Sequence, residues 1–163
     1  MPAGPAAVAR RTRLLSGDDI ERVIAIDRAH TGRTRRHFFE KRFAAAKVRP
    51  EEFIQLGVDR GGVLRGFAIA RILRGEFGHE RAVAVLDALG VEPQSEERGV
   101  GRALMEELIA LADGMEVGFL QSQADWTNTY LLRFFAASGF ALAPRLALER
   151  PVAAPLDEAI EDL

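Results

Sequence analysis

Residues 81–91, "RAVAVLDALGV", restrict the fold more than any other stretch, because apolar residues occupy both alternating faces of an extended segment. Strands of this kind are buried on both sides, as in sheets that carry helices on each face. The stretch therefore predicts a central strand in a layered protein of mixed α and β structure.

Other elements follow from the spacing of apolar residues. Two strand-like runs at residues 53–58 and 64–73 are joined by Asp-Arg-Gly-Gly, a composition suited to a hairpin turn. Further strands are expected at residues 12–16, 117–123 and 145–150. Helical spacing predicts helices at residues 16–28, 34–47, 99–112 and 127–138. The expected fold class is α/β (α+β): a mixed central sheet of six to seven strands flanked by about four helices.

Length and composition bound the organisation. The 163 residues contain no internal repeat, so we expect one domain at residues 11–150 between a disordered tail at 1–10 and an acidic tail at 151–163. With no cysteine, disulfides, thiolate metal sites and cysteine nucleophiles are excluded. No apolar run approaches the ~20 residues of a membrane helix, and no secretory signal is evident, so we expect a cytoplasmic protein.

A pair of glycines opens the helix that follows the central strand. In "VEPQSEERGVGRALMEEL", residues 91–108, the strand ends in Val91-x-Pro93 and Gly99-x-Gly101 begins the helix. Unpaired amides and the positive helix end attract an anion, and glycines let a phosphate come close. The dinucleotide fingerprint fails at Leu104, and no Gly-Lys-Ser/Thr is present. Alone, this stretch fits a pyrophosphate site and an ordinary core-helix entry equally well.

A second motif lies downstream: "NTYLLRFFAASGF", residues 128–140. In their order and spacing the two motifs resemble the GCN5-related N-acetyltransferase (GNAT) superfamily, over about residues 11–150. The resemblance implies that acetyl-CoA binds with its pyrophosphate on main-chain amides and its pantetheine arm along the central strand. It assigns cofactor contacts to Leu89, Gly90, Val91, Arg98, Gly99, Val100, Gly101, Arg102, Ala103, Asn128 and Phe135.

Two positions depart from the family pattern. Glu96 stands where the family usually has Gln or Arg, which predicts a modest loss of cofactor affinity. Phe135 occupies the slot where many members carry a tyrosine that protonates the departing CoA thiolate. A phenyl ring cannot donate a proton, so another group is required.

Transfer to an alkyl amine also needs a base. An ammonium of pKa ~10.4 is neutral in only a few molecules per ten thousand at pH 7, which adds about 4–5 kcal/mol to the barrier. Asp87 is the first candidate, since strand alternation places it with Val83, Val85, Leu89 and Val91 beside the cofactor arm. A structural aspartate is the alternative. Tyr130, the one tyrosine in the chain, is a candidate proton donor, with a packing role as its alternative.

Candidate acceptor contacts lie in two places. Arg33, Arg35 and Arg36 belong to a basic segment, residues 27–43, and are suited to a carboxylate or phosphate, or else form a solvated helix face. Asp125 and Trp126 end a strand and are candidates to contact a cationic or aromatic amine, although Trp126 also fits the core. His30, His37 and His79 show no metal-ligand spacing and are interpreted as non-catalytic, so no metal is expected.

The resulting hypothesis is an acetyl-CoA-dependent N-acetyltransferase acting on a primary amine of a small molecule or protein. The amine attacks directly in a ternary complex, while a strand amide near Leu89–Val91 polarises the thioester carbonyl. The alternative, favoured by Phe135, is an acyl-CoA-binding sensor or interaction module with little or no turnover. Neither a membrane nor a nucleic-acid partner is expected, since no aromatic platform accompanies the arginines; a homodimer is left open.

Overall fold

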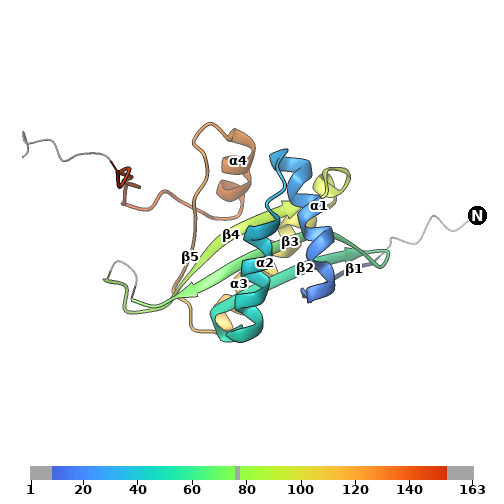
Figure 1. Ribbon diagram of the computed structural model, residues 1–163, viewed down its shortest axis with the longest axis horizontal. Coiled ribbons are helices and arrows are strands. Elements are labelled where there is room, and N and C mark those ends of the chain that lie inside the picture. Colours follow the sequence, from blue (N-terminus) through green and yellow to red (C-terminus); the bar gives the residue numbers. More distant parts are fainter. Residues whose placement is uncertain (1–8, 76–77, 154–163) are drawn as a thin grey trace, which may run out of the picture.

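The computed structural model describes residues 9–75 and 78–153, and within them five strands form one sheet in the order β1-β2-β3-β4-β5 (Figure 1). Strands β1 to β4 run antiparallel to their neighbours, and β5 joins β4 in parallel. The strands are β1 Arg10–Leu14, β2 Phe53–Arg60, β3 Val63–Leu73, β4 Val83–Val91 and β5 Phe119–Ser122.

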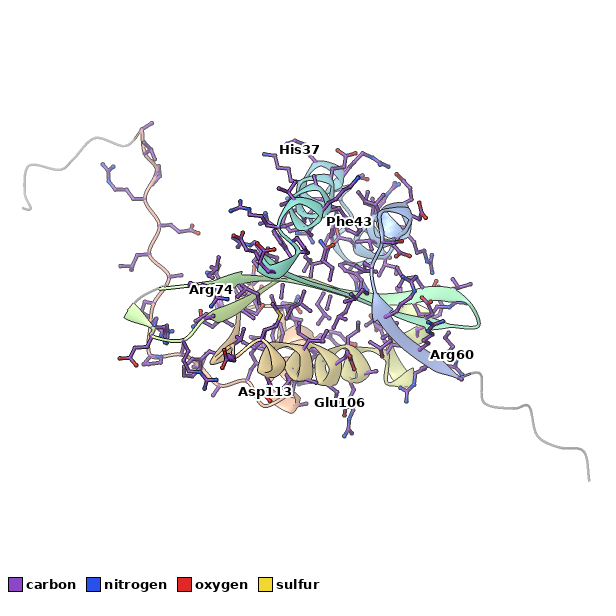
Figure 2. The ribbon with its side chains drawn as sticks, turned by 90° about the horizontal axis from the view of Figure 1, so that it is seen from below. His37, Phe43, Arg60, Arg74, Glu106 and Asp113 are labelled. Atoms are coloured by element: carbon purple, nitrogen blue, oxygen red, sulfur yellow. The ribbon has the colours of Figure 1, made fainter. Side chains whose placement is uncertain are left out.

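Four α-helices complete the described part of the fold: α1 Ile20–Thr31, α2 Arg36–Val48, α3 Val100–Gly114 and α4 Thr129–Ala137. Short 3-10 turns lie at η1 Gly17–Asp19, η2 Pro50–Glu52 and η4 Pro93–Arg98. Figure 2 shows α1 and α2 on one face of the sheet and α3 on the other. A separate buried cluster lies under each helix layer, and β4 contributes residues to both. The prediction that residues 81–91 form a strand covered on both faces is confirmed.

The predicted hairpin is confirmed as well. Strands β2 and β3 meet at Gly61 and Gly62, whose φ angles of 62° and 72° lie in the left-handed region. Two successive residues of positive φ match the right-handed twist of the strands that they join.

The predicted strand at residues 145–150 is wrong. Residues 140–150 contain no helix or strand, and Leu142, Leu146 and Leu148 are 98%, 88% and 89% exposed. Alternating apolar residues favour a strand, but a strand also needs a neighbouring strand to pair with. This segment has no such partner among the described residues. Within the described residues the sheet therefore has five strands, rather than the six to seven that were predicted. Most of the two expected tails, residues 1–10 and 151–163, lies outside the described residues.

A β-bulge interrupts the pairing of β3 with β4. Ile69 lies opposite Ala88 and Ala70 lies opposite Leu86, so Asp87 has no residue opposite it. Alternation consequently changes phase at this point.

The bulge corrects the face predicted for Asp87. Leu89 and Val91 pack against the cluster under α3, to which Leu86 also belongs, whereas Asp87 makes its ion pair with Arg42 of α2. The sequence had placed Asp87 on the same face as Leu89 and Val91, and that expectation is wrong.

Glu92, directly after β4, joins three parts of the fold. Its carboxylate accepts hydrogen bonds from Arg22 of α1 and from Arg65 of β3, the latter at 2.6 Å. Burial opposes the charged form, but the two guanidinium groups outweigh it, and the pKa of Glu92 lies below its usual value. Its contribution to stability is therefore present at neutral pH, above the unfolded-state pKa, and is lost as pH falls through the lowered folded-state pKa.

We expect Glu92→Gln to lower the melting temperature at pH 7, and to lower it less as the pH falls below 4, because the wild type then loses the same ion pairs. Thermal denaturation from pH 7 to pH 3 measures the difference. Glu52→Gln is the matched control: Glu52 pairs with Arg49 at 3.1 Å on the surface, where an ion pair contributes little. A pH-independent effect of Glu92→Gln would contradict the prediction.

Candidate functional site

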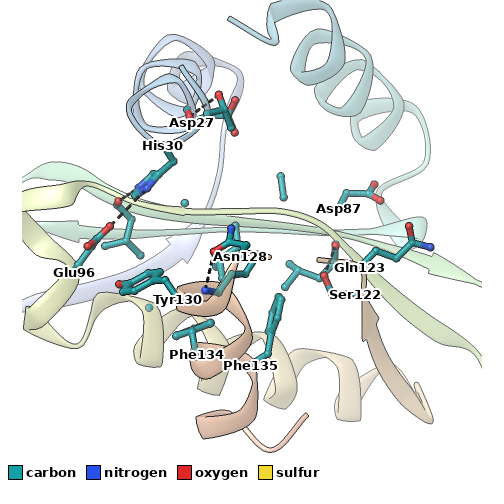
Figure 3. A pocket seen from close by; sticks show the side chains of 18 of the residues that line it. Asp27, His30, Asp87, Glu96, Ser122, Gln123, Asn128, Tyr130, Phe134 and Phe135 are labelled. Atoms are coloured by element: carbon teal, nitrogen blue, oxygen red, sulfur yellow. Dashed lines mark hydrogen bonds and ion pairs between the residues drawn. The ribbon is translucent and has the colours of Figure 1, made fainter. Parts of the chain in front are cut away.

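A cavity opens where β4 and β5 cease to pair. The last paired residues are Leu86 and Ser122, but β4 continues to Val91. Beyond Leu86 the strand edge that faces β5 lines a cavity of about 510 Å³ (Figure 3). The end of α1, the start of α3 and the side of α4 close the remaining walls.

The glycine turn lies at one end of this cavity. Gly99 has a φ of 71° and starts α3, and Gly99, Gly101 and Arg102 line the cavity. The amides of a first helical turn have no acceptor within the helix, although that of Ala103 already donates to the Gly99 carbonyl at 3.1 Å. Of the predicted run from Arg98 to Ala103, the donors at Val100, Gly101 and Arg102 are thus the best suited to an anion.

Packing around Gly101 is tight. A Cβ atom at this position would lie 3.1 Å from Cε2 of Phe134 and 3.6 Å from Cγ2 of Val91. Because the first contact is short, a side chain here would shift the Phe134 ring by a few tenths of an ångström, and glycine avoids that shift.

Two charged groups flank the glycine turn. The Arg102 guanidinium donates to Glu106 at 2.7 Å on the exposed side of α3, while Glu96 lines the cavity itself. The side chain of Arg98 lies outside what the structure describes. Glu96 therefore places a carboxylate in the same cavity as the amides that would receive an anion.

His30 joins this end of the cavity to α1. Its Nε2 donates to the carbonyl of Val91, and its Nδ1 lies 3.7 Å from a carboxylate oxygen of Glu96. The two contacts of His30 could not be predicted from the sequence, because both partners lie about sixty residues farther along the chain. Figure 3 shows His30 reaching across toward Glu96.

The edge of β4 supplies the middle of the cavity. Leu89, Gly90 and Val91, predicted as contacts for a pantetheine arm, all line it. No strand covers this edge among the described residues, so its backbone groups are available to an extended ligand, except for the Val91 carbonyl, which accepts from His30.

Helix α4 forms the opposite wall. Asn128 caps it, with its side-chain oxygen accepting from the Leu131 amide at 3.1 Å. Tyr130 lines the cavity and is 64% exposed, so a core-packing role does not describe it. Phe135 is buried, with its ring centroid 4.8 Å from that of Phe140, and its edge reaches the same cavity.

Asp87 lies on β4, closer to the start of that strand than Leu89, and it also lines the cavity. Its side chain is 8% exposed; the carboxylate accepts from Arg71 at 2.5 and 2.9 Å and lies 2.8 Å from Nε of Arg42. A carboxylate has about four lone-pair sites, so these contacts leave it able to accept a further proton or water.

Of the three candidate arginines, only Arg35 lines the cavity. It donates to the buried carboxylate of Asp27 at 2.9 and 2.5 Å, and this hydrogen bonding raises the pKa of Arg35. Arg36 instead pairs with Glu21 on the outer surface, at 2.6 and 2.9 Å. Arg33 lies in the exposed loop before α2.

Asp125 and Trp126 do not line the cavity. Asp125 accepts from the hydroxyl and amide of Thr127, which lowers the pKa of its carboxyl group, and Trp126 is 84% exposed, so it is not a core residue either. Ser122, which the sequence did not single out, and Gln123, which was interpreted as structural rather than as a substrate ligand, both line the cavity at the end of β5. Ser122 is the last paired residue of β5 and Gln123 follows it, so both lie where the two strands separate.

The cavity thus has an amide-rich end, an open strand edge and an end with two buried, arginine-paired carboxylates. Within residues 9–75 and 78–153, no three His, Cys, Asp or Glu side chains are grouped to hold a metal ion. In the same part of the chain, no helix has the length and apolar character to cross a membrane.

Comparison with known proteins identifies this arrangement. Residues 20–140 match the acetyltransferase (GNAT) family, which confirms the resemblance seen in the two motifs. No curated protein matches the sequence.

Three solved structures illustrate the shared fold. A transcriptional regulator from Bacillus halodurans C-125 has a TM-score of 0.74 at 15% identity, over 88% of this chain and 99% of its own. The aminoglycoside N-acetyltransferase AAC(6')-Iy in complex with CoA has a TM-score of 0.74 at 18% identity, over 93% and 99%. The aminoglycoside 6'-N-acetyltransferase AAC(6')-Ih from Acinetobacter baumannii has 0.72 at 14%, over 88% and 98%. At these identities the likeness shows the fold alone, but the family match spans well over half of the chain, and the protein belongs to the acetyltransferase (GNAT) family.

Proposed function

We propose that the protein is an N-acetyltransferase that moves an acetyl group from acetyl-CoA to a primary amine within a ternary complex. The observation that carries this proposal is the single cavity that joins the first turn of α3 to the unpaired edge of β4. Solved structures of the similar AAC(6')-Iy contain CoA and a CoA-based bisubstrate analogue, which supports the choice of donor.

The residues present fit such a donor. First-turn amides around Gly99 and Gly101 suit its pyrophosphate, with Arg98 and Arg102 near enough in sequence to add positive charge. The edge from Leu89 to Val91 suits an extended arm that carries amides of its own. Asn128 keeps its side-chain NH₂ group for the same ligand, because only its oxygen serves as the helix cap.

Acetyl-CoA supplies the thioester, and the chain supplies orientation and proton transfer. An amide of β4 near Leu89–Val91 polarises the thioester carbonyl, while Asp87 takes a proton from the amine, directly or through water. The amine nitrogen forms the new C–N bond as the C–S bond breaks. Tyr130 is the candidate donor to the departing thiolate, since Phe135 carries no proton to give. The products are the acetylated amine and CoA.

Two measurements test the proposal. Acetyl-CoA should raise the melting temperature, and a panel of primary amines should release free CoA in its presence. Binding without turnover on any amine would favour the acyl-CoA sensor that Phe135 suggests. The absence of any thermal shift at millimolar acetyl-CoA would exclude both functions.

Glu96 gives a second prediction about the donor. Its carboxylate lines the phosphate end of the cavity, so it repels the charge that the glycine turn attracts. We expect Glu96→Gln to tighten acetyl-CoA binding by roughly twofold to fivefold, the range of a partly exposed charge pair. Titration calorimetry measures the affinity, and Glu107→Gln on the exposed surface of α3 is the control. Weaker binding after Glu96→Gln would show that this carboxylate assists the site.

A further inference from the structure

We propose that the acceptor is an amine that also carries an anionic group, a carboxylate or a phosphate, and that Arg35 and Arg42 bind this group. The inference rests on the proposed function and specifies its substrate class. It also assigns a role to Arg42, which the sequence had not singled out.

The first observation is the charge at the end of the cavity where Asp27 and Asp87 lie, which we call the acceptor end. Asp27 and Asp87 both line the cavity with side chains that are only 5% and 8% exposed, and both form ion pairs with guanidinium groups. These two carboxylates form ion pairs with three arginines, Arg35, Arg42 and Arg71, so the cluster carries a net positive charge. Figure 3 shows Asp27 and Asp87 on the wall that faces Asn128 and Tyr130 of α4.

The surrounding segment adds to this charge. Residues 27–43 contain six Lys and Arg residues against two carboxylates, Asp27 and Glu40. A cationic acceptor therefore finds no unneutralised buried carboxylate here, whereas an anion is attracted.

Unused donors carry the second step. Arg35 donates to Asp27 through Nε and Nη2, which leaves Nη1 without a hydrogen-bond partner among the residues that the structure describes. Arg42 has its buried Nε 2.8 Å from Asp87 without hydrogen-bond geometry, and its terminal nitrogens have no hydrogen-bond partner in that part of the chain either. Both guanidinium groups thus retain N–H donors for a further anion.

The guanidinium groups of both arginines lie over the ring of Phe38. The Cζ atoms of Arg35 and Arg42 lie 5.0 and 4.9 Å from the centroid of the same Phe38 ring. Stacking on an aromatic ring restricts both side chains before any ligand arrives. Two guanidinium groups restricted by the same ring suit the several oxygens of a carboxylate or phosphate.

This substrate class differs from that of the aminoglycoside acetyltransferases that share the fold. An aminoglycoside carries several ammonium groups. Arg35, which lines this end of the cavity, and Arg42 and Arg71, which lie behind it against Asp87, oppose such a ligand. The acceptor should instead present one reactive amine and one anion.

Matched acceptors test the inference. Acetyl transfer to 4-aminobutanoate, butylamine and 1,4-diaminobutane compares an anionic, an uncharged and a cationic far end on the same chain length. The pair O-phosphoethanolamine and ethanolamine compares a phosphate with an uncharged hydroxyl at the far end. Its ratio can then be compared with the ratio for the carboxylate of 4-aminobutanoate against butylamine. We expect kcat/KM for at least one anionic acceptor to exceed that for its uncharged partner by roughly tenfold or more, mainly through a lower KM. A tenfold ratio corresponds to the free energy of one charge-assisted hydrogen bond. The diamine should be the poorest of its series.

Variants locate the effect. Arg42→Gln should remove the preference for the anion, measured as the ratio of kcat/KM for 4-aminobutanoate to kcat/KM for butylamine, while Arg71 still holds Asp87. Arg35→Lys should weaken the preference by keeping the charge without the planar donor set. Arg36→Gln, whose side chain pairs with Glu21 outside the cavity, is the control and should retain the preference.

The outcomes separate this inference from the proposed function. A thermal shift with acetyl-CoA confirms for each variant that the donor site is intact. Calorimetry of the same amines with CoA-saturated protein decides the inference even where no turnover occurs. Equal use or binding of anionic, uncharged and cationic amines, or an equal loss on all of them in Arg42→Gln, would overturn it. Binding of anionic amines without any turnover would retain it and reject the transferase.

Discussion

Gly101→Glu is expected to abolish the rise in melting temperature that acetyl-CoA produces in the wild type. At a hundredfold excess over Kd that rise should be about 5–10 °C for a domain of this size. The substitution places a carboxylate in the first turn of α3, beside the amides proposed to bind phosphate, and its Cβ atom crowds the Phe134 ring. Thermal denaturation with and without acetyl-CoA measures the effect.

Gly114→Glu provides the matched control at the other end of the same helix. A Cβ atom there meets nothing within 4 Å, and the position lies outside the cavity, so the acetyl-CoA shift should persist. Gly101→Ala separates crowding from charge: its methyl group displaces the Phe134 ring by a few tenths of an ångström and should reduce the shift without abolishing it. An undiminished shift in folded Gly101→Glu would place the donor elsewhere.

The elements predicted correctly are those whose signal is local. The apolar faces of residues 81–91, the glycine pair at Gly61 and Gly62, and the helical spacing after Gly99 each involve neighbours in sequence, and the structure contains all three. Such patterns depend little on distant partners.

Elements that depend on distant partners were less predictable. The apolar alternation of residues 145–150 is a property of the segment, whereas a strand also needs an edge to pair with. The bulge at Asp87 arises from the register between β3 and β4, and strict alternation cannot reveal a shift of one residue.

The two ends of the candidate site differ in the same way. The glycine turn and the edge from Leu89 to Val91 were predicted together, because the strand ends directly before the motif and the family resemblance connects the two. The ion pairs of Asp27 with Arg35 and of Asp87 with Arg42 join α1, α2 and β4, and no spacing in the sequence connects Arg42 with Asp87. The basic segment was recognised as unusual, but which of its arginines reach the cavity depends on how α2 packs.

Asp87→Asn is expected to lower kcat for an alkyl amine by roughly 10²–10⁴-fold, the usual contribution of a general base, with the affinity for acetyl-CoA unchanged. The amide keeps the size of the side chain and one oxygen for Arg71, but it can no longer take a proton. Steady-state kinetics and acetyl-CoA calorimetry measure the two quantities. Asp59→Asn is the control, because Asp59 also pairs with an arginine, Arg13, at 2.7 Å but lies outside the cavity.

The choice of acceptor distinguishes a base from a residue that only positions Arg42 and Arg71. An aromatic amine is already neutral at pH 7 and needs no base for activation, whereas an alkyl ammonium must lose a proton before it attacks. Asp87→Asn should therefore impair acetylation of 4-(aminomethyl)benzoate far more than that of 4-aminobenzoate, and the shared carboxylate keeps anion binding the same in both. An equal loss on the two acceptors would show that Asp87 acts by holding the arginines and the bulge of β4, and the base would then have to be sought elsewhere in the cavity.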